Sequence, residues 1–494
     1  MLSAIEQKRL QISRATEATK KSQFGQFFTP ERTAAFMAGL FPDSTGVCRL
    51  LDAGAGIGSL SAAFLERWVS GSLHFQRVEL EAFEIDHTLH PHLEQVLEKY
   101  KRGKDLTITV RGDDFINKAV DSLSGYMFSE RLPKYTHAIL NPPYKKINSN
   151  SAHRLALRKV GIETVNLYSA FLALAIALAA PGGQIVAIIP RSFCNGPYYR
   201  PFRTFLFERV AIRHIHLFDS RSKAFKDDEV LQENIILRLE RGGQQQSVTI
   251  STSTDDTFAD LVFHEHPFEQ IVPSGDLEQF IHVPTSTKAN IIEISSNISF
   301  TLADLGIQVS TGPVVDFRLK EYLRDMPSPS TVPLLYPSHF TNSGITWPIQ
   351  GAKKPNAIEH NANTEKWLYP TGYYCVVRRF SSKEEKRRVV ASVVDHDALG
   401  GAPMIGFENH LNLFHENKHG LPQALAHGLA VFLNSTAVDE YFRRFNGHTQ
   451  INATDLRLMR YPSRAALIGL GEWALQQKQL SQTLIDDKVG TLTE

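Results

Sequence analysis

Apolar and polar positions alternate in blocks through the first half of the chain. Short apolar segments of five to eight residues lie at 48–53, 78–85, 106–110, 136–140, 184–190 and 212–218. This is the usual length of a buried strand, so the pattern predicts six strands in this half.

Segments with a helical pattern separate these strands. They lie at 58–69, 87–101, 166–180 and 199–209. Short apolar strands that alternate with helices imply a parallel sheet covered on both faces, so we predict an α/β fold. Two more strand segments, 233–239 and 247–252, follow in close succession, and we expect them to form an antiparallel edge.

The character of the sequence changes at about residue 255. The segments beyond it are shorter, stretches such as the proline-rich 327–333 interrupt them, and helical patterns are rare before residue 421. Residues 465–485 are again helical in pattern. We therefore expect two domains, residues 1–255 and residues 256–494. The second should be rich in strands and loops, with a helical C-terminal tail.

The composition is that of an ordinary globular protein, with 42% apolar and 21% charged residues among 494. The formal net charge of +1 gives no sign of a nucleic-acid partner for the chain as a whole. Two stretches are basic, however: 131–159 has seven Lys/Arg and no Asp/Glu, and 200–226 has seven against two. A basic stretch is usually a solvated face, but two that flank a candidate active site favour a nucleic acid as partner.

The three cysteines, Cys48, Cys194 and Cys375, are far apart and form no Cys-x-x-Cys pattern. This argues against a disulfide framework or a zinc module, and we expect no metal. The N-terminal segment is too polar for a signal peptide. The most apolar run, 171–180, has about half the length needed to span a bilayer. We therefore expect a cytoplasmic protein with no membrane segment.

Residues 50–60, LLDAGAGIGSL, combine an apolar strand that ends in an acid, a glycine-rich turn and the start of a helix. Gly54 and Gly56 would let the backbone approach a ligand closely, because a β-carbon would collide there. Asp52 precedes them. Such glycines also form ordinary tight turns, so this motif alone is weak.

Acids also follow the next two strands. Glu84 follows the second strand, where a carboxylate can hold a ribose diol, and Asp114 and Phe115 follow the third. Asp114 can accept a hydrogen bond from an adenine amino group, with the Phe115 ring beside the base; alternatively, Asp113 and Asp114 only cap the next helix. Because the carboxyl ends of parallel strands meet at one edge, the set predicts a single ligand crevice.

The fourth strand is followed directly by Asn141, Pro142, Pro143 and Tyr144. Two consecutive prolines fix the backbone, so the Pro142 carbonyl and the Asn141 side-chain oxygen can grip one amino group. Gripping both protons localises the nitrogen lone pair, which suits attack on the methyl group of a sulfonium donor. Tyr144 offers an aromatic face to a base pulled out of a helix. The alternative reading of Asn-Pro is a simple turn.

In these motifs, and in FGQFFTPERTAAFM at 24–37, the chain resembles the gamma-class adenine-N6 DNA methyltransferases of bacterial restriction–modification systems. The resemblance implies a Rossmann-like methyltransferase sheet, S-adenosylmethionine as cofactor, and Gln26 and Thr29 at its methionine end. Thr29 can cap the helix begun by Pro30. Phe225 is implied as a second aromatic against the flipped base; an ordinary loop phenylalanine is the alternative.

The resemblance also implies that the C-terminal domain recognises the target sequence in double-stranded DNA. A separately encoded cognate endonuclease is compatible with it. We expect Arg443, Arg444 and His448 to contact phosphates or base edges, and Lys145 and Lys146 to contact DNA beside the catalytic loop. A solvated surface is the alternative for all five.

Three other functions use part of the same pattern. A protein methyltransferase acting on a glutamine amide uses the same Asn-Pro-Pro-Tyr grip but has no need of a large C-terminal domain. An RNA adenine methyltransferase would share the chemistry and differ only in recognition. A non-catalytic specificity subunit would have no chemical reason to keep Asn141 and both prolines.

Overall fold

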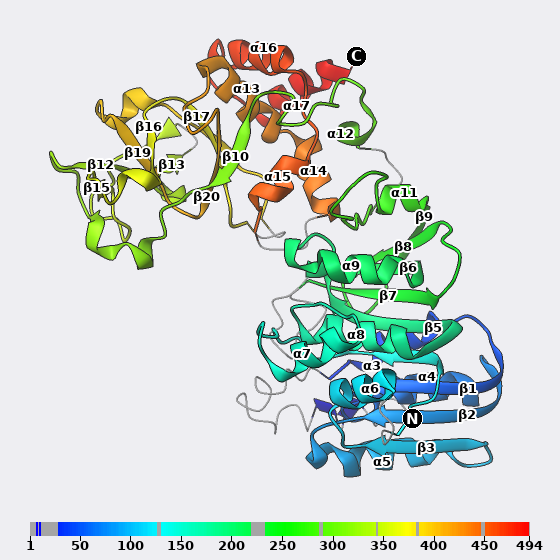
Figure 1. The fold of residues 1–494 in the computed structure, drawn as a ribbon. Coiled ribbons are helices and arrows are strands. Elements are labelled where there is room, and N and C mark those ends of the chain that lie inside the picture. The colour runs from blue at the N-terminus through cyan, green and yellow to red at the C-terminus, as the bar shows by residue number, and fades with distance from the viewer. Residues whose placement is uncertain are drawn as a thin grey trace. The chain divides into compact units, whose positions relative to one another are not determined.

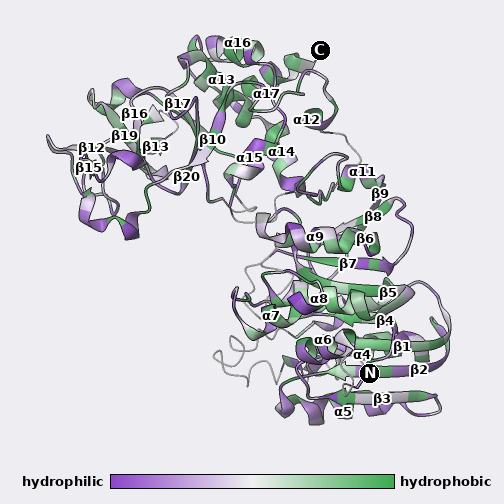
Figure 2. Cartoon of the chain, viewed as in Figure 1, coloured by the Kyte–Doolittle hydropathy of each residue, from purple (hydrophilic) through white to green (hydrophobic). Residues whose placement is uncertain are grey.

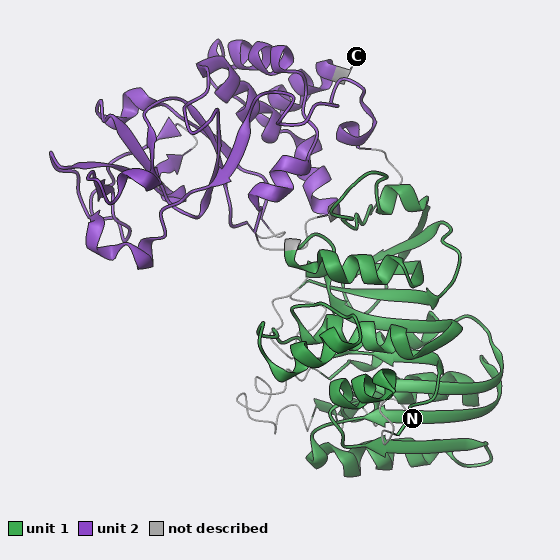
Figure 3. Ribbon diagram, in the orientation of Figure 1, with its two compact units in different colours: residues 1–287 green, residues 288–494 purple. Residues whose placement is uncertain are grey.

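The computed structural model describes residues 6–7, 9–10, 28–125, 130–218, 233–285, 290–341, 344–381, 385–445 and 450–493. The chain divides into two compact units, residues 1–287 and residues 288–494 (Figure 3). The change in sequence character predicts the boundary between the two domains at about residue 255 instead. The first unit continues to 287 because β9 (Val262–His266) adds to its sheet and the amide of Ile281 donates to the carbonyl of Cys194 at 2.9 Å.

The first unit is built on a nine-stranded sheet in the order β3-β2-β1-β4-β5-β7-β6-β8-β9 (Figure 1). Its other strands are β1 (Thr45–Ala53), β2 (His74–Phe83), β3 (Leu106–Arg111), β4 (Tyr135–Leu140), β5 (Ala179–Pro190), β6 (Val210–Phe218), β7 (Asn234–Arg241) and β8 (Val248–Ser253). The first five are mutually parallel, and β7 is antiparallel to both β5 and β6. The six strands expected from the apolar segments are confirmed.

The expected pairing of the last two strand segments is wrong. β7 does not pair with β8; it lies between β5 and β6, while β8 pairs in parallel with β6 and antiparallel with β9. The reason is visible in β7 itself. Ile235 and Leu237 are buried in one core, and Ile236 is buried in the other. A strand that is apolar on both faces is stabilised inside a sheet rather than at its edge.

Helices cover both faces of this sheet. One core contains residues of α3 (Glu31–Gly39), α4 (Ser59–Val69) and α5 (His90–Leu97). The opposite core contains residues of α6 (Phe115–Ser124), α7 (Ala152–Lys159), α8 (Leu167–Leu178) and α9 (Arg200–Phe207). Hydrophobic residues run along the central strands between the two layers (Figure 2).

A short helix, α11 (Phe268–Ile271), follows β9. None of the helices in the described ranges is long and apolar enough to cross a membrane.

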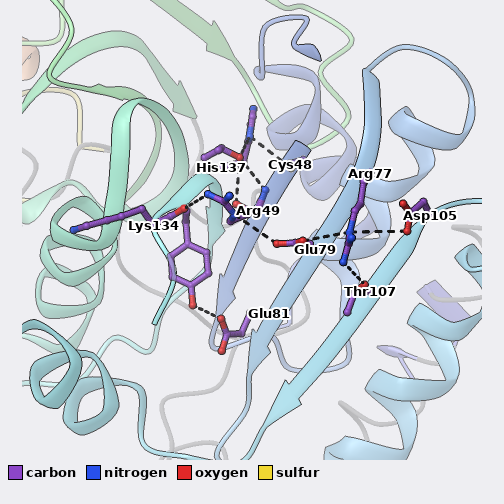
Figure 4. Close-up of polar contacts among 11 residues, drawn as sticks. Cys48, Arg49, Arg77, Glu79, Glu81, Asp105, Thr107, Lys134 and His137 are labelled. Atoms are coloured by element: carbon purple, nitrogen blue, oxygen red, sulfur yellow. Dashed lines mark hydrogen bonds and ion pairs between the residues drawn. The ribbon is translucent and has the colours of Figure 1, made fainter. Parts of the chain in front are cut away.

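The first strands carry a ladder of charges across their middle, away from the carboxyl ends (Figure 4). Glu79 on β2 lies 3.5 Å from the Arg49 guanidinium and 3.2 Å from that of Arg77, which is also 3.9 Å from Asp105. All four side chains are more than a third exposed. Exposed pairs of this kind contribute little to stability, so this ladder is a solvated surface. The polar residues expected to carry chemistry lie at the carboxyl ends.

The second unit combines short strands with a cluster of helices. Its sheets have the orders β10-β20-β17-β18, β11-β15-β12-β19-β16 and β13-β14. The strands are β10 (Gln308–Thr311), β11 (Leu323–Arg324), β12 (Thr331–Leu335), β13 (Phe340–Thr341), β14 (Gly344–Ile345), β15 (Ala357–Glu359), β16 (Leu368–Pro370), β17 (Tyr374–Arg378), β18 (Ala391–Val394), β19 (Met404–Phe407) and β20 (Leu411–His415). This agrees with the strand-rich character expected of the C-terminal half.

The helices of this unit are α12 (Ile291–Ile294), α13 (Gln423–Leu433), α14 (Thr436–Phe445), α15 (Ala453–Leu458), α16 (Arg464–Leu475) and α17 (Gln482–Gly490). Two glycines let α13 and α16 cross with their backbones in contact. A β-carbon on Gly428 would lie 1.7 Å from the carbonyl oxygen of Leu467, and one on Gly471 would lie 1.7 Å from that of Ala424. Any side chain at either position would force the helices apart.

Candidate active site

A cavity of about 330 Å³ lies where the carboxyl ends of β1, β2, β3 and β4 meet. Its walls include nine residues that the sequence analysis assigned to the cofactor, to the catalytic loop or to DNA: Gly54, Gly56, Glu84, Asp114, Phe115, Asn141, Pro143, Lys145 and Lys146. Parallel strands place their carboxyl ends at one edge, which is why residues from four separate segments converge. The predicted crevice therefore exists as a single site.

The glycine-rich turn forms one wall. Gly54 and Gly56 have φ angles of +82° and +57°, which glycine adopts without strain. A β-carbon on Gly56 would lie 3.1 Å from the Phe28 ring, so space as well as backbone conformation favours glycine. The Gly56 amide donates to a carboxylate oxygen of Glu84 at 2.8 Å, which ties the turn to the end of β2.

Glu84 is buried at the next strand end. Its second carboxylate oxygen accepts the amide of Asp86 at 2.8 Å. Burial raises the pKa of Glu84, although the two amide donors oppose the shift. Each carboxylate oxygen has two lone pairs, so both can still accept a hydroxyl group. Glu84 can therefore hold a pair of neighbouring hydroxyls, as a ribose presents.

Asp52 has a different position from the one expected of a ligand-binding residue. It is fully buried behind the glycine turn and accepts the Ser61 hydroxyl at 2.6 Å. Burial raises its pKa to about 7. The bond to Ser61 joins the end of β1 to the first turn of α4, so in this structure Asp52 supports the glycine turn from behind.

Asp114 combines the two roles that the sequence left open. One carboxylate oxygen caps α6 by accepting the amide of Asn117 at 3.0 Å, and the other lies 2.8 Å from Nε2 of His153 on α7. Burial raises the pKa of Asp114, but the bonds from His153 and Asn117 outweigh it and leave the pKa lowered. The bond to Asp114 in turn raises the pKa of His153.

His153 was not found from the sequence. It lines the cavity although it lies 39 residues beyond Asp114. No motif marks it, and the basic character of 131–159 was the one available signal. The apolar wall residues Phe28, Ile85 and Phe171 were also missed, because single aromatic or aliphatic residues are indistinguishable from core residues in a sequence.

In the Asn-Pro-Pro-Tyr loop after β4, both polar atoms of the Asn141 side chain form hydrogen bonds. The Asn141 side-chain nitrogen donates to the Thr29 hydroxyl at 3.0 Å, and its oxygen accepts the Tyr144 hydroxyl at 3.0 Å. Tyr144 also donates to the carbonyl of Ile188 at 3.3 Å. Burial raises the pKa of Tyr144, so the phenol remains a donor. The side-chain oxygen of Asn141, the atom expected to accept from an amino group, thus already accepts a hydrogen bond from Tyr144.

The expected helix cap at Thr29 is wrong. The N-cap of α3 is Pro30, and the first amide of the helix, that of Glu31, donates to the Glu6 carboxylate at 3.0 Å. Thr29 turns to Asn141 instead, so the buried hydroxyl belongs to the catalytic loop and not to the helix end.

The segment after Tyr144 forms the rim of the same cavity. Lys145, Lys146, Asn148, Ser151 and His153 all line it. The backbone of this segment is held by the amide of Leu167, which donates to the Lys145 carbonyl at 2.8 Å, and by a bridge between Lys146 and Asn166. Both lysines are exposed, and they therefore border the cavity as well as the solvent beside it.

The two arginines predicted to bind DNA have acidic partners within the second unit. Arg443 lies 2.6 Å from Asp439, and Arg444 lies 2.6 Å from Glu293. Arg444 is mostly buried, whereas Arg443 is about a third exposed. Gln26, Phe225 and His448, the remaining predicted site residues, lie outside the described residues.

Within the described ranges, one group of side chains could approach a metal. Asp395, His396 and Asp397 bring one ligand atom each within 4.8 Å of one another. Asp395 already accepts the amide of Asp397 at 3.0 Å as the cap of a short helix, so the cluster is explained by capping.

The sheet order and the cavity at its carboxyl edge define a methyltransferase of the S-adenosylmethionine-dependent fold class. Residues 53–225 match the family model described as Eco57I restriction-modification methylase. The chain is 51% identical over its full length to the type II methyltransferase M.BsuBI of Bacillus subtilis, covering 98% of that protein. It is 43% identical to the type II methyltransferase M.PstI of Providencia stuartii, over 95% of this chain and 93% of that protein.

A solved structure with the same fold is that of MmeI, a type IIL restriction-modification enzyme in complex with DNA. It aligns with a TM-score of 0.50 at 10% identity, over 93% of this chain and 69% of that one. The chain belongs to the type II methyltransferase family of restriction–modification systems, and methyl transfer to DNA follows from that membership.

Proposed function

We propose that this protein transfers a methyl group from S-adenosylmethionine to the exocyclic N6 amino group of adenine in double-stranded DNA, after flipping the base out of the helix. The observation that carries the proposal is the Asn141 amide at the wall of the acid-lined cavity. Its oxygen accepts a hydrogen bond at 3.0 Å from Tyr144. An oxygen held in this way can accept one from a substrate amino group.

The cavity residues match the parts of S-adenosylmethionine. Glu84 can accept two ribose hydroxyls, and Asp114 can accept the adenine amino group beside Phe115. Gly54 and Gly56 allow the methionine portion to approach the backbone near Thr29. When bound, the cofactor supplies a sulfonium methyl group as the electrophile. We propose Asp52 as a residue that acts on this site only through the glycine turn.

The chain's own residues activate the nucleophile. The Asn141 side-chain oxygen and the Pro142 carbonyl accept the two amino protons, which localises the nitrogen lone pair. Pro143 fixes the backbone at this point. The Asn141 oxygen has two lone pairs, so it can accept one amino proton beside the Tyr144 hydroxyl, and the Tyr144 ring can pack against the base. We propose Phe225 for the opposite side of the base.

Sequence recognition is proposed for the second unit. Arg443, Arg444 and His448 are proposed DNA contacts there, and Lys145 and Lys146 are proposed phosphate contacts next to the cavity. A cognate restriction endonuclease encoded separately is the proposed partner in protecting host DNA. The similarity to type II methyltransferases includes the second unit, which favours DNA over a glutamine side chain or RNA as substrate.

The test is transfer of a tritiated methyl group to duplex DNA, to RNA and to a release-factor protein in parallel. Label should enter DNA alone, and nucleoside analysis should place it on adenine N6. Label on protein or RNA, or on cytosine in DNA, would refute the proposal. Sequencing the DNA of an expressing host for modified adenines then gives the target sequence.

A further inference from the structure

Asn234, the first residue of β7, is a buried amide whose hydrogen-bonding groups are unused. It is 4% exposed, and neither its side-chain oxygen nor its nitrogen has a partner among the residues that the structure describes. Buried polar groups are nearly always paired because leaving them unpaired is costly. Both amide atoms of the buried Asn195 are also without a partner among these residues, and each such amide requires an explanation.

The position of Asn234 in the sheet supplies one. β7 runs opposite to β5 and pairs Asn234 with Pro190, the last residue of β5. β5 pairs on its other side with β4, which Asn141 follows directly. Asn234 and Asn141 thus lie at the same edge of the sheet with one strand between them. Two strand spacings separate them by roughly 10 Å across the sheet, and Asn234 lies two positions further along β5 than Asn141, which adds roughly 7 Å along the strands.

The two amides also lie on the same face. Along β7, Ile236 belongs to the core that contains α3, and Arg238 donates to the carbonyl of Leu40 at the end of α3. Because alternate residues of a strand share a face, Asn234 points to that side as well. Asn141 donates to Thr29, immediately before α3, and so faces the same way.

A buried ion pair fixes the backbone next to Asn234. Arg191 lies 2.8 Å from Glu233, and its amide donates to the Glu233 carbonyl at 2.7 Å. Both side chains are only 2% exposed. The pair joins the residue after β5 to the residue before β7, so it holds the start of β7 in register. Asn234 is consequently held in place at the same edge of the sheet as Asn141, although it does not itself line the cavity.

We propose that Asn234 is a specificity-determining residue that hydrogen-bonds the ring edge of the flipped adenine while Asn141 holds its amino group. This inference rests on the proposed function. The amide nitrogen can donate to N3 or N7 of adenine, both of which are hydrogen-bond acceptors. A purine has the reach to meet both amides. Cytosine has no counterpart of adenine N3 or N7, so it would leave Asn234 unpaired. A site built to hydrogen-bond one substrate rejects an analogue that lacks the bonding group.

The test compares wild type with Asn234→Leu, on duplexes whose target position carries adenine, cytosine, or 1-, 3- or 7-deazaadenine. The variant should lose roughly tenfold in kcat/KM on adenine, the size of a lost hydrogen bond, and should gain relative activity on cytosine. One deaza analogue should lower the wild-type rate by a similar factor and should make wild type and variant equal. The KM for the cofactor should not change.

Thermal unfolding separates recognition from structure. Asn234→Leu should be at least as stable as wild type, because an apolar side chain of similar size replaces an unpaired amide. The matched control is Asn412→Leu in the second unit. That amide is fully buried, donates to the Ile451 carbonyl at 2.7 Å and accepts the Thr311 hydroxyl at 3.0 Å, so its loss should lower the melting temperature.

A lower melting temperature for Asn234→Leu together with an unchanged adenine-to-cytosine ratio would overturn the inference. If this variant does not fold, Asn234→Thr gives the same comparison of ratios, and an unchanged ratio there would overturn it too. Failure of the wild-type protein to methylate adenine in DNA would instead refute the proposed function, so the two failures are distinguishable.

Discussion

The side-chain nitrogen of Asn141 donates a hydrogen bond to the hydroxyl oxygen of Thr29 at 3.0 Å, across 112 positions of the chain. An amide has one oxygen and one nitrogen, so engaging the nitrogen decides which way the oxygen faces. The segment before α3 thus sets the orientation of the group proposed to grip the substrate.

Thr29→Val should therefore slow methyl transfer. It removes the acceptor for Asn141 while keeping the size of the side chain. We expect the activation free energy to rise by roughly 1 kcal/mol, which lowers the single-turnover rate about fivefold. Thr29→Ser keeps the hydroxyl and should restore most of the rate. Equal rates for the valine and serine variants would show that the bond does not matter for catalysis.

Asn141→Ala should abolish methyl transfer and leave cofactor binding nearly intact. It removes one of the two acceptors for the amino group, and losing a preorganised group of this kind typically costs about 10²–10³-fold in kcat. Tritiated transfer measures the rate and calorimetry measures cofactor affinity. Transfer above a few per cent of wild type would be incompatible with the assigned role.

Tyr144→Phe and Tyr144→Ala should behave differently. The phenylalanine variant removes the hydroxyl that occupies the Asn141 oxygen and keeps the ring, so binding of the flipped base should not weaken. The alanine variant should lose about 1–3 kcal/mol of stacking. Fluorescence of 2-aminopurine at the target position reports both. Loss of binding in Tyr144→Phe as large as in Tyr144→Ala would contradict the proposed stacking of the Tyr144 ring against the base.

The Asp114–His153 pair should make stability depend on pH. The pKa of His153 is raised above its usual 6.5, so its contribution is complete below that value and is lost as pH rises through the folded-state pKa. The pKa of Asp114 is lowered below its usual 3.8, so its contribution is complete above that value and is lost as pH falls through the folded-state pKa. The pair should therefore stabilise most in mildly acidic solution.

His153→Gln is the corresponding variant. Its melting temperature should fall furthest below wild type between about pH 4 and 6.5 and approach it in alkaline solution. His74→Gln is a suitable control, because His74 also pairs with an acid, Asp43, at 2.7 Å but is mostly exposed at the far end of β2. A difference for His153→Gln that does not vary with pH would show that charge is not involved.

Arg444→Ala and Arg443→Ala should separate folding from DNA contact in the second unit. Arg444 is mostly buried against Glu293, so its loss should lower the melting temperature. Arg443 is more exposed. If it contacts a phosphate, its loss should weaken binding to all DNA sequences alike. It should also reduce by about one the slope of the logarithm of the binding constant against the logarithm of salt concentration. DNA binding measured at several salt concentrations distinguishes the two effects. If Arg443→Ala has the same salt slope as wild type, Arg443 does not contact a phosphate.

Much of the first unit could be predicted because its signals are local. Strand length, the glycines at 54 and 56, and an acid or Asn-Pro-Pro-Tyr after each strand are all readable within a few residues. The parallel order then brings those ends together. What could not be predicted depends on pairing between distant segments. The position of β7 between β5 and β6 and the bond between Asp114 and His153 are of this kind.

Thr29 and Asp52 show a second limit. Both were expected on the basis of residue type and position, and both are buried polar residues at the site. Their partners, Asn141 and Ser61, decide what they do, and a hydroxyl or carboxylate in a sequence does not name its partner. The type and position of such a residue predict that it lies at the site, but they do not predict which residue it bonds to or what it does there.

The contact between Gly428 and Gly471 limits how this protein can evolve. At these two positions the opposing backbone leaves no volume even for a methyl group. We therefore expect relatives of this chain to differ in the loops of the second unit while keeping glycine at both positions, because the crossing of α13 with α16 depends on them.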